Sequence, residues 1–361
     1  MDRGNRARPA LRPDGQDHFH ALRVAVGLLA PATVLLTTGR PELMIFAVFG
    51  AFAGMYGRGE TARLRRRHQM QAAVLLTVGV AVGVSLSNLA VPTWVLVVVE
   101  IGFAMAGSVV ADACGLRPAG PFFFLFALGA TAVVPAGVVD PVVALAICAA
   151  TAALAVVIGA VGVPGSRDDR PASCGVPPGA WVHATRYGIA IAAAGGVGVF
   201  LGFAHANWAM ASAAVPLAVI GIGGPAAGEI RPVLSRAGHR VAGTCAGLVL
   251  TAAVLAADLP PWALAALMVA LLFPTELFMA RHYAVAIGFF TPLIMLMCEL
   301  ADPADPMQLV GYRGLDTLIG VAAGVVVAVL VRGRGCSSAA AETAADGAAR
   351  VGCHAGRSVR S

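Results

Sequence analysis

The fold of this chain is decided by residues 183–247, which read HATRYGIAIAAAGGVGVFLGFAHANWAMASAAVPLAVIGIGGPAAGEIRPVLSRAGHRVAGTCAG. Two apolar blocks come first. A charged segment follows, and a third apolar block begins where that segment ends. Apolar blocks of this length, separated by short charged turns, are typical of helices that cross a membrane one after another.

A weaker copy of the same arrangement opens the protein. The matching anchors are His20–Arg23 with His183–Arg186, Gly59–Glu60 with Gly228–Glu229, His68 with His239, and Trp94 with Trp262. The two members of each pair are separated by nearly the same number of residues. A constant offset over several independent anchors indicates an internal duplication.

The composition excludes an ordinary soluble protein. Hydrophobic residues make up 58% of the 361 residues and charged residues only 12%, against about 25% charged residues in globular domains. The sequence contains no Lys, and its arginines stand at the ends of apolar blocks, which argues against a nucleic-acid partner. The seven Cys form no CxxC pair, so we expect no metal site, no disulfide framework and no cofactor.

The predicted fold is an all-α polytopic membrane protein with about 12 transmembrane helices, arranged as two parallel six-helix repeats. The expected blocks are Ala21–Gly39, Pro41–Gly57, Met70–Val91, Thr93–Ala113, Gly120–Pro135, Pro141–Val163, His183–Ala204, Asn207–Gly224, Arg240–Ala257, Trp262–Met279, His282–Leu300 and Arg313–Val331. An even number of spans in each half makes both copies enter from the same face. The predicted parts are a cytoplasmic tail (1–20), the first repeat (21–163), a cytoplasmic linker (164–182), the second repeat (183–332) and a disordered cytoplasmic tail (333–361).

The charge distribution predicts the orientation. With a cytoplasmic N-terminus, all arginines except Arg40 and Arg313 fall on the cytoplasmic side, as the positive-inside rule requires. We expect a multi-pass protein of the cytoplasmic membrane with both termini in the cytoplasm and no removable signal peptide. GxxxG pairs begin at Gly50, Gly79, Gly243 and Gly320, and such pairs allow helices in lipid to pack closely.

With these features in view, the chain resembles the fusaric acid resistance (FUSC) family of membrane proteins. The resemblance rests on the duplicated arginine-led unit, the Gly-Glu turns and the segment His239–Thr244, and it covers residues 20–163 and 183–332. It implies similarity to bacterial aromatic acid exporters and to plant aluminium-activated malate transporters. Many members carry a large cytoplasmic domain after the first membrane half, where this chain has only a short linker.

Ionisable groups at membrane depth are the first candidates for function. Glu100 lies at the centre of its apolar block and suits a proton carrier that alternates between a charged and a neutral form. The alternative is a neutral carboxyl bonded to a neighbouring helix. A GxxxxGK[ST] nucleotide site is impossible without Lys, so an ion gradient, a partner subunit or downhill flow must drive transport.

Four arginines and one aspartate are further candidates for substrate binding: Arg23, Arg186, Arg240, Arg281 and Asp316. Arginine binds carboxylates well, and the first two arginines occupy matching places in the two halves. The alternative for each arginine is a topology anchor at the headgroups.

Glu60 and Glu229 sit in cytoplasmic turns, where a gating role and simple pairing with nearby arginines are both open. Phe122 to Phe124, Phe126, Phe289 and Phe290 could stack on an aromatic substrate, although most of them must face lipid or other helices.

The functional prediction is an exporter of small organic or aromatic acids, driven by an ion gradient and working by alternating access of two similar halves. A passive anion channel of the malate-channel type and a non-transporting membrane scaffold subunit are the alternatives. We do not expect an enzyme, because no nucleophile–base spacing is present. The expected partners are the lipid bilayer and a small organic anion, while a homo-oligomer or a periplasmic adaptor is left open.

Overall fold

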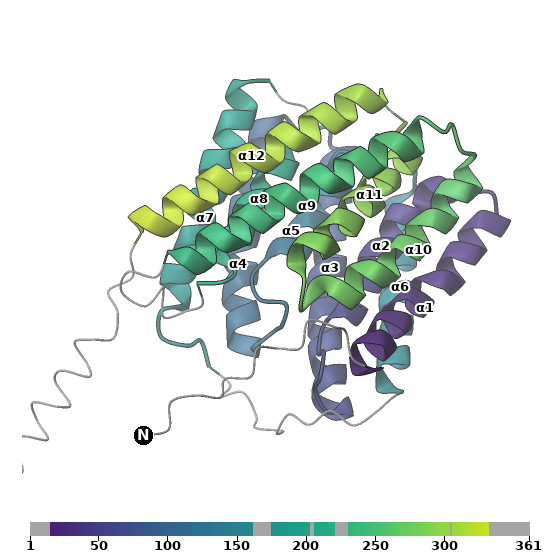
Figure 1. Ribbon diagram of the computed structural model, residues 1–361, viewed down its shortest axis with the longest axis horizontal. Coiled ribbons are helices and arrows are strands. Elements are labelled where there is room, and N and C mark those ends of the chain that lie inside the picture. The colour runs from purple at the N-terminus through teal and green to yellow at the C-terminus, as the bar shows by residue number, and fades with distance from the viewer. Residues whose placement is uncertain (1–14, 162–174, 203–205, 221–229, 304, 332–361) are drawn as a thin grey trace, which may run out of the picture.

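The computed structural model of the chain describes residues 15–161, 175–202, 206–220, 230–303 and 305–331, and every regular element in these ranges is a helix (Figure 1). The α-helices are α1 (Gly15–Thr37), α2 (Met44–Ala51), α3 (Ala62–Asn88), α4 (Thr93–Cys114), α5 (Phe122–Ala132), α6 (Pro141–Ala160), α7 (Ala180–Phe200), α8 (Ala206–Leu217), α9 (Arg231–Leu255), α10 (Pro261–Met279), α11 (Tyr283–Ala301) and α12 (Pro306–Leu330). Short 3₁₀ turns, Pro41–Leu43 and Phe52–Met55, flank α2. The predicted all-helical fold is confirmed.

Each predicted apolar block contains one of these helices, but four helices begin at least six residues earlier than predicted. α1 begins at Gly15, α3 at Ala62, α9 at Arg231 and α12 at Pro306. The arginines expected in turns before the third and ninth blocks, except Arg58, therefore lie in the first three turns of helices. Two local signals fix such starts: Thr61 Oγ1 accepts a hydrogen bond from Leu64 N at 3.5 Å, and Asp305 caps α12 through the backbone N–H groups of Met307 and Gln308.

Eight helices of the described chain are long and apolar enough to cross a membrane, namely α1, α3, α4, α6, α9, α10, α11 and α12. Their outward faces carry large apolar side chains such as Val74, Val249 and Leu330. Apolar surface of this extent needs lipid to cover it. The chain is therefore a multi-pass membrane protein.

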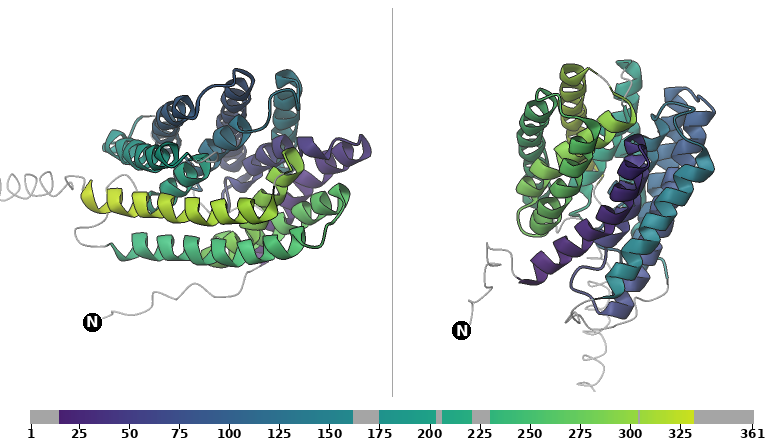
Figure 2. Two further views of the ribbon diagram at one scale, coloured as in Figure 1. Left: turned by 90° about the horizontal axis from the view of Figure 1, so that it is seen from above. Right: turned by 90° about the vertical axis from the view of Figure 1, so that its right-hand side faces the viewer.

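The short helices form the centre of the molecule. Every residue of α2 and of α8 is buried, and α5 is buried at nearly every position. A helix that is apolar on all sides is stable in lipid or in a protein core, and these short helices are buried in the core. The long helices supply that cover, and α9 and α12 run side by side along one face (Figure 2).

The first helix of each half packs on the opposite half as well as on its own. α1 packs on α10 of the second half, and α7 packs on α4 of the first half. Each crossing contains a histidine–carboxylate contact: His20 Nε2 lies 3.2 Å from Glu276 Oε2, and His183 Nδ1 lies 3.0 Å from Asp112 Oδ2. Contacts inside the halves also recur, since α2 meets α6 as α8 meets α12, and α3 meets α5 as α9 meets α11.

Contacts at the helix ends show that successive helices run in alternate directions. At one end, Arg281 from the end of α10 bonds to Asp17 at the start of α1, and Arg186 near the start of α7 donates to Val331 O after α12. At the other end, Arg40 after α1 donates to Val138 O, which follows α5. We call the first of these the arginine end, because most arginines of the described helices lie there.

The predicted close packing at the GxxxG pairs is confirmed. A Cβ on Gly79 would lie 2.7 Å from Phe124 O of α5. A Cβ on Gly243 would lie 2.4 Å from Ala284 O in the first turn of α11. Gly50 and Gly320 meet α6 and α8 in the same way. Backbones approach this closely only where no side chain intervenes.

Gly320→Ala is expected to destabilise the protein by about 2 kcal/mol, within the range for overpacked cores. The added methyl group would lie 2.1 Å from Ala209 O, a backbone atom that cannot rotate away. Gly311→Ala on the same helix is the control, because nothing lies within 4 Å of its added Cβ. Thermal unfolding in lipid nanodiscs measures both, and equal melting temperatures would contradict the prediction.

Candidate functional site

A cavity of about 350 Å³ lies at the arginine end, between the two halves. Its polar wall contains His20 from α1, Arg58 after α2, Arg117 before α5, Arg236 from α9 and Glu276 from α10. This volume lies within the usual range for small-molecule sites. Since both halves contribute to the wall, any movement of one half against the other would change the shape of the cavity.

The electrostatics of the cavity favour an anion. Three arginines face one glutamate, and Glu276 already has His20 within 3.2 Å. The first residues of α5 and α11, Phe122 and Tyr283, are also in the wall. Helix N-termini carry partial positive charge and free N–H groups, which add to the attraction for a carboxylate.

Two of the arginines are held in place by neighbours. Arg58 Nη2 donates to the backbone oxygen of Glu276 at 2.6 Å, which ties the loop after α2 to α10. The Arg236 guanidinium lies 3.2 Å from the centroid of the Tyr283 ring. Stacking on a ring fixes the plane of a guanidinium and leaves its edges available to a carboxylate.

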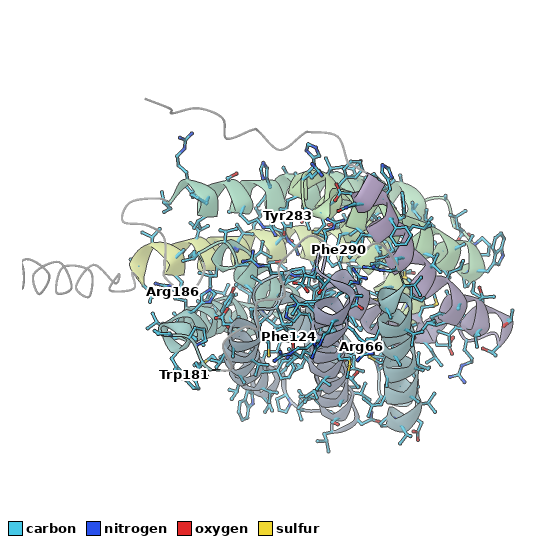
Figure 3. All side chains as sticks on the ribbon, turned by 90° about the horizontal axis from the view of Figure 1, so that it is seen from below. Arg66, Phe124, Trp181, Arg186, Tyr283 and Phe290 are labelled. Carbon is cyan, nitrogen blue, oxygen red and sulfur yellow. The ribbon has the colours of Figure 1, made fainter. Side chains whose placement is uncertain are left out.

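The remaining wall of the cavity is apolar and includes four aromatic rings. Phe122 and Phe123 come from α5. Tyr283 and Phe290 come from α11 (Figure 3). The Phe122 and Phe123 ring centroids are 5.1 Å apart, and Phe123 meets Phe290 edge-on at 6.1 Å. These rings suit a flat apolar body attached to an acid group.

Beyond the cavity wall, two arginines from α9 and α12 lie against the aromatic side chains of α5. The Arg240 guanidinium lies 5.0 Å from the Phe122 ring centroid. One turn further along α5, Arg313 lies 5.8 Å from the Phe126 ring centroid and 5.1 Å from that of Trp208. Both guanidiniums are buried to 1% exposure.

The predicted proton carrier lies about one turn further still. Glu100 is 0% exposed, and neither of its carboxyl oxygens has a hydrogen-bond partner among the described residues. A Cβ on Gly129 of α5 would lie 2.5 Å from Glu100 Oε1 and 3.3 Å from Asn207 Nδ2. The Asn207 amide also lacks a partner in the described chain. A carboxyl group and an amide thus meet across a glycine at the interface of α4, α5 and α8.

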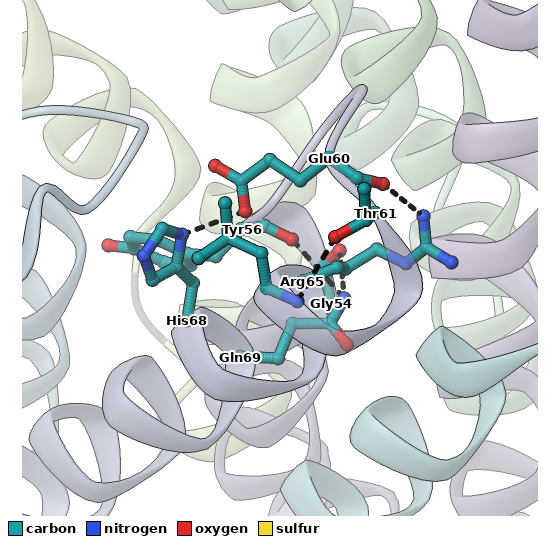
Figure 4. Close-up of polar contacts among 8 residues, drawn as sticks. Gly54, Tyr56, Glu60, Thr61, Arg65, His68 and Gln69 are labelled. Atoms are coloured by element: carbon teal, nitrogen blue, oxygen red, sulfur yellow. Dashed lines mark hydrogen bonds and ion pairs between the residues drawn. The ribbon is translucent and has the colours of Figure 1, made fainter. Parts of the chain in front are cut away.

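Glu60 belongs to a buried cluster that fixes the loop before α3 (Figure 4). Its carboxylate lies 2.8 Å from His68 Nδ1, and its backbone oxygen accepts from Arg65 Nη1 at 3.0 Å. Arg65 Nε donates to Gly159 O at 2.7 Å, and Gln69 Nε2 bonds to Gly54 O. The cluster anchors the loop that carries Arg58. Glu60 therefore supports the cavity wall but does not line the cavity.

The structure does not bring the other predicted arginines into the cavity. Arg23 Nη2 donates to His20 Nδ1 at 3.0 Å, and Arg281 Nε donates to Asp17 Oδ2 at 2.5 Å. Arg186 is buried beside the end of α12, apart from Tyr283 and Phe290 (Figure 3). The expected pairing of Arg23 and Arg186 along one central path is therefore not seen. Glu229 lies outside the described residues.

Asp316 follows Arg313 by one turn of α12, and neither of its carboxyl oxygens has a hydrogen-bond partner in the described chain. Arg313 itself was expected on the outer face, but it lies two turns into α12. Asp305 followed by Pro306 is a helix-start signal that could have corrected this. Arg58, Arg117 and Asn207 carry no signal in the sequence beyond their residue type.

No group of three or more His, Cys, Asp or Glu able to hold a metal ion lies within the described ranges. In the comparison with known protein families, residues 180–327 fit the model of a family described as fusaric acid resistance protein-like. The matched range includes Arg236, Arg240, Glu276 and Arg313. No curated protein and no solved structure matches the chain.

Proposed function

Since residues 180–327 identify the chain as a membrane protein of the fusaric acid resistance protein-like family, a transporter type of protein, we propose that it exports small organic acids with a flat apolar body. The observation that carries this proposal is the cavity between the halves. Arg58, Arg117 and Arg236 attract a carboxylate there, while Phe122 and Phe290 accept the ring.

Alternating access is the proposed mechanism, and the recurrence of helix contacts in the two halves supports it. α1 crosses to α10 as α7 crosses to α4, which is the pattern expected of two parallel repeats. The cavity lies at the arginine end, and the positive-inside rule assigns that end to the cytoplasm. The substrate would therefore enter from the cytoplasm and leave on the other side.

A proton gradient is the proposed driving force, with Glu100 as the group that gains and loses the proton. Its burial without a hydrogen-bond partner among the described residues supports this role, since a buried carboxylate is unstable unless neutralised. Glu100, like Arg240 and Arg313, lies beside α5. Substrate and proton could therefore influence each other through α5.

Arg236→Gln is expected to raise the half-saturating concentration of benzoate roughly tenfold or more, the usual loss for one charge-assisted hydrogen bond. Reconstituted liposomes with radiolabelled benzoate give the initial rate of flux. Arg231→Gln is the matched control, because Arg231 is an exposed residue at the start of the same helix. If both variants match the wild type, the cavity does not bind the acid; unitary current steps in a planar bilayer would identify a passive anion channel instead.

A further inference from the structure

The geometry points to a second anion site, separate from the cavity, between the guanidiniums of Arg240 and Arg313. We propose that a small inorganic anion of halide size, chloride under cellular conditions, resides there. The site is built by α9, α12, α5 and α8, and its wall includes Phe122, Phe126 and Trp208.

The charge of the two arginines is not balanced by hydrogen-bonded carboxylates. Arg313 Nε, Nη1 and Nη2 and Arg240 Nε and Nη1 have no hydrogen-bond partner among the described residues. The two guanidiniums lie over rings whose centroids are 6.0 Å apart, so their positive charges repel each other, and Asp316 offsets only part of the charge of Arg313. The desolvation free energy of a buried guanidinium without a counter-ion is far larger than the stabilisation that a cation–π contact supplies. An anion between the two groups would accept their free N–H donors and remove the repulsion.

The aromatic groups hold the two guanidiniums over one common surface. The Phe122 and Phe126 rings are parallel within 5°, with centroids 6.0 Å apart. Arg240 covers the first ring, and Arg313 lies between the second ring and Trp208. Both guanidiniums are therefore buried beside the same pair of rings, and charge-assisted hydrogen bonds to a bound anion would be strong there.

The two guanidiniums do not line the cavity in the structure. Phe122 belongs to the cavity wall, whereas Arg240, Arg313 and Phe126 do not. A bulky organic acid would have to displace the Phe122 ring, but a small ion needs only a brief opening. These facts favour an inorganic anion over the acid that the cavity would bind.

Asp316 does not take the place of this anion. It follows Arg313 on α12, yet both of its carboxyl oxygens lack a hydrogen-bond partner among the described residues. A direct ion pair would have satisfied atoms on both side chains. The Arg313 donors therefore remain available to a ligand.

Trp208 provides a probe at the site itself. Trp208 is 1% exposed, whereas Trp94, Trp181 and Trp262 are all more than 60% exposed. Replacing these three with Phe leaves Trp208 as the sole tryptophan of the full chain. Iodide quenches tryptophan on contact, so a bound iodide reports its own occupancy. The protein in lipid nanodiscs is titrated with sodium iodide at constant ionic strength, with gluconate as the balancing anion.

Saturable quenching of Trp208 by iodide, reversed by chloride but not by gluconate, is the expected result. Arg240→Gln and Arg313→Gln should each weaken it at least tenfold, while Arg40→Gln at the opposite end should leave it unchanged. Linear, unsaturable quenching in the single-tryptophan protein with both arginines intact would overturn the proposal. This result does not depend on whether the arginine variants fold. Reversal by benzoate but not by chloride would also overturn it, because the site would then hold the organic acid.

The proposal does not depend on the function of the cavity. Arg236→Gln should weaken benzoate flux and leave the iodide signal of Trp208 intact. If Arg236→Gln does not change benzoate flux while iodide still quenches Trp208, only the proposed transport substrate is rejected. Loss of the iodide signal with normal benzoate flux would reject the inorganic anion site alone.

Discussion

Glu100→Gln is expected to reduce the accumulation of organic acid driven by a pH gradient roughly 100-fold, a typical loss when a positioned proton-transfer group is removed. Exchange of labelled for unlabelled acid across liposomes at equal pH should continue. The carboxamide has nearly the same shape as the carboxyl group, so the contacts with Gly129 and Asn207 can be retained. The amide cannot gain or lose a proton, so only coupling is lost.

The measurement compares two rates in the same liposomes: uptake after a pH jump and exchange without a gradient. Glu42→Gln is the control, since Glu42 pairs with Arg40 at the other end of the molecule and is partly exposed. A Glu100→Gln protein that still responds fully to the pH jump would remove Glu100 from the mechanism. Loss of both rates together would indicate a structural role only.

His20→Ala is expected to lower the free energy of unfolding by about 3 kcal/mol. This value lies between the cost of leaving a buried acceptor unpaired and that of breaking a buried ion pair. Glu276 is 2% exposed, and it would lose the imidazole at 3.2 Å that joins α1 to α10. Arg23 would lose its acceptor on the same ring.

Unfolding by urea in mild detergent measures this change, and His239→Ala is the control because His239 is an exposed histidine on α9. The double variant His20→Ala/Glu276→Ala should be less destabilised than the sum of the two single variants, since the two groups are in contact. Equal stability of the His20→Ala and His239→Ala proteins would mean that the crossing of α1 and α10 is held by apolar contacts alone.

Much of the fold could be predicted because hydropathy and glycine spacing are local signals. Every apolar block contains a helix, and the glycines at 79, 83, 243 and 247 lie at close helix contacts. The His20 and His183 anchors also lie at equivalent crossings. The helix starts were harder, because charged first turns such as Ala62–His68 look like loops when only hydropathy is considered.

The cavity could not be predicted in the same way. Its arginines come from a loop after α2, a loop before α5 and the second turn of α9, which are far apart in the chain. Nothing local distinguishes Arg58 or Arg117 from an arginine that anchors a helix at the headgroups. Arg281, a candidate for substrate binding, bonds to Asp17 and does not line the cavity.

The packing of each first helix on the opposite half has a consequence for how the protein is made. When a ribosome has inserted the first six helices, α1 can contact α2 and α6 but not yet α10, and the face of α4 that will receive α7 is still open to lipid. The packing of α1 is completed only after α10 has been synthesised. We therefore expect that neither half, produced alone, reaches its mature packing, and that two separately encoded halves restore it only when both are inserted together.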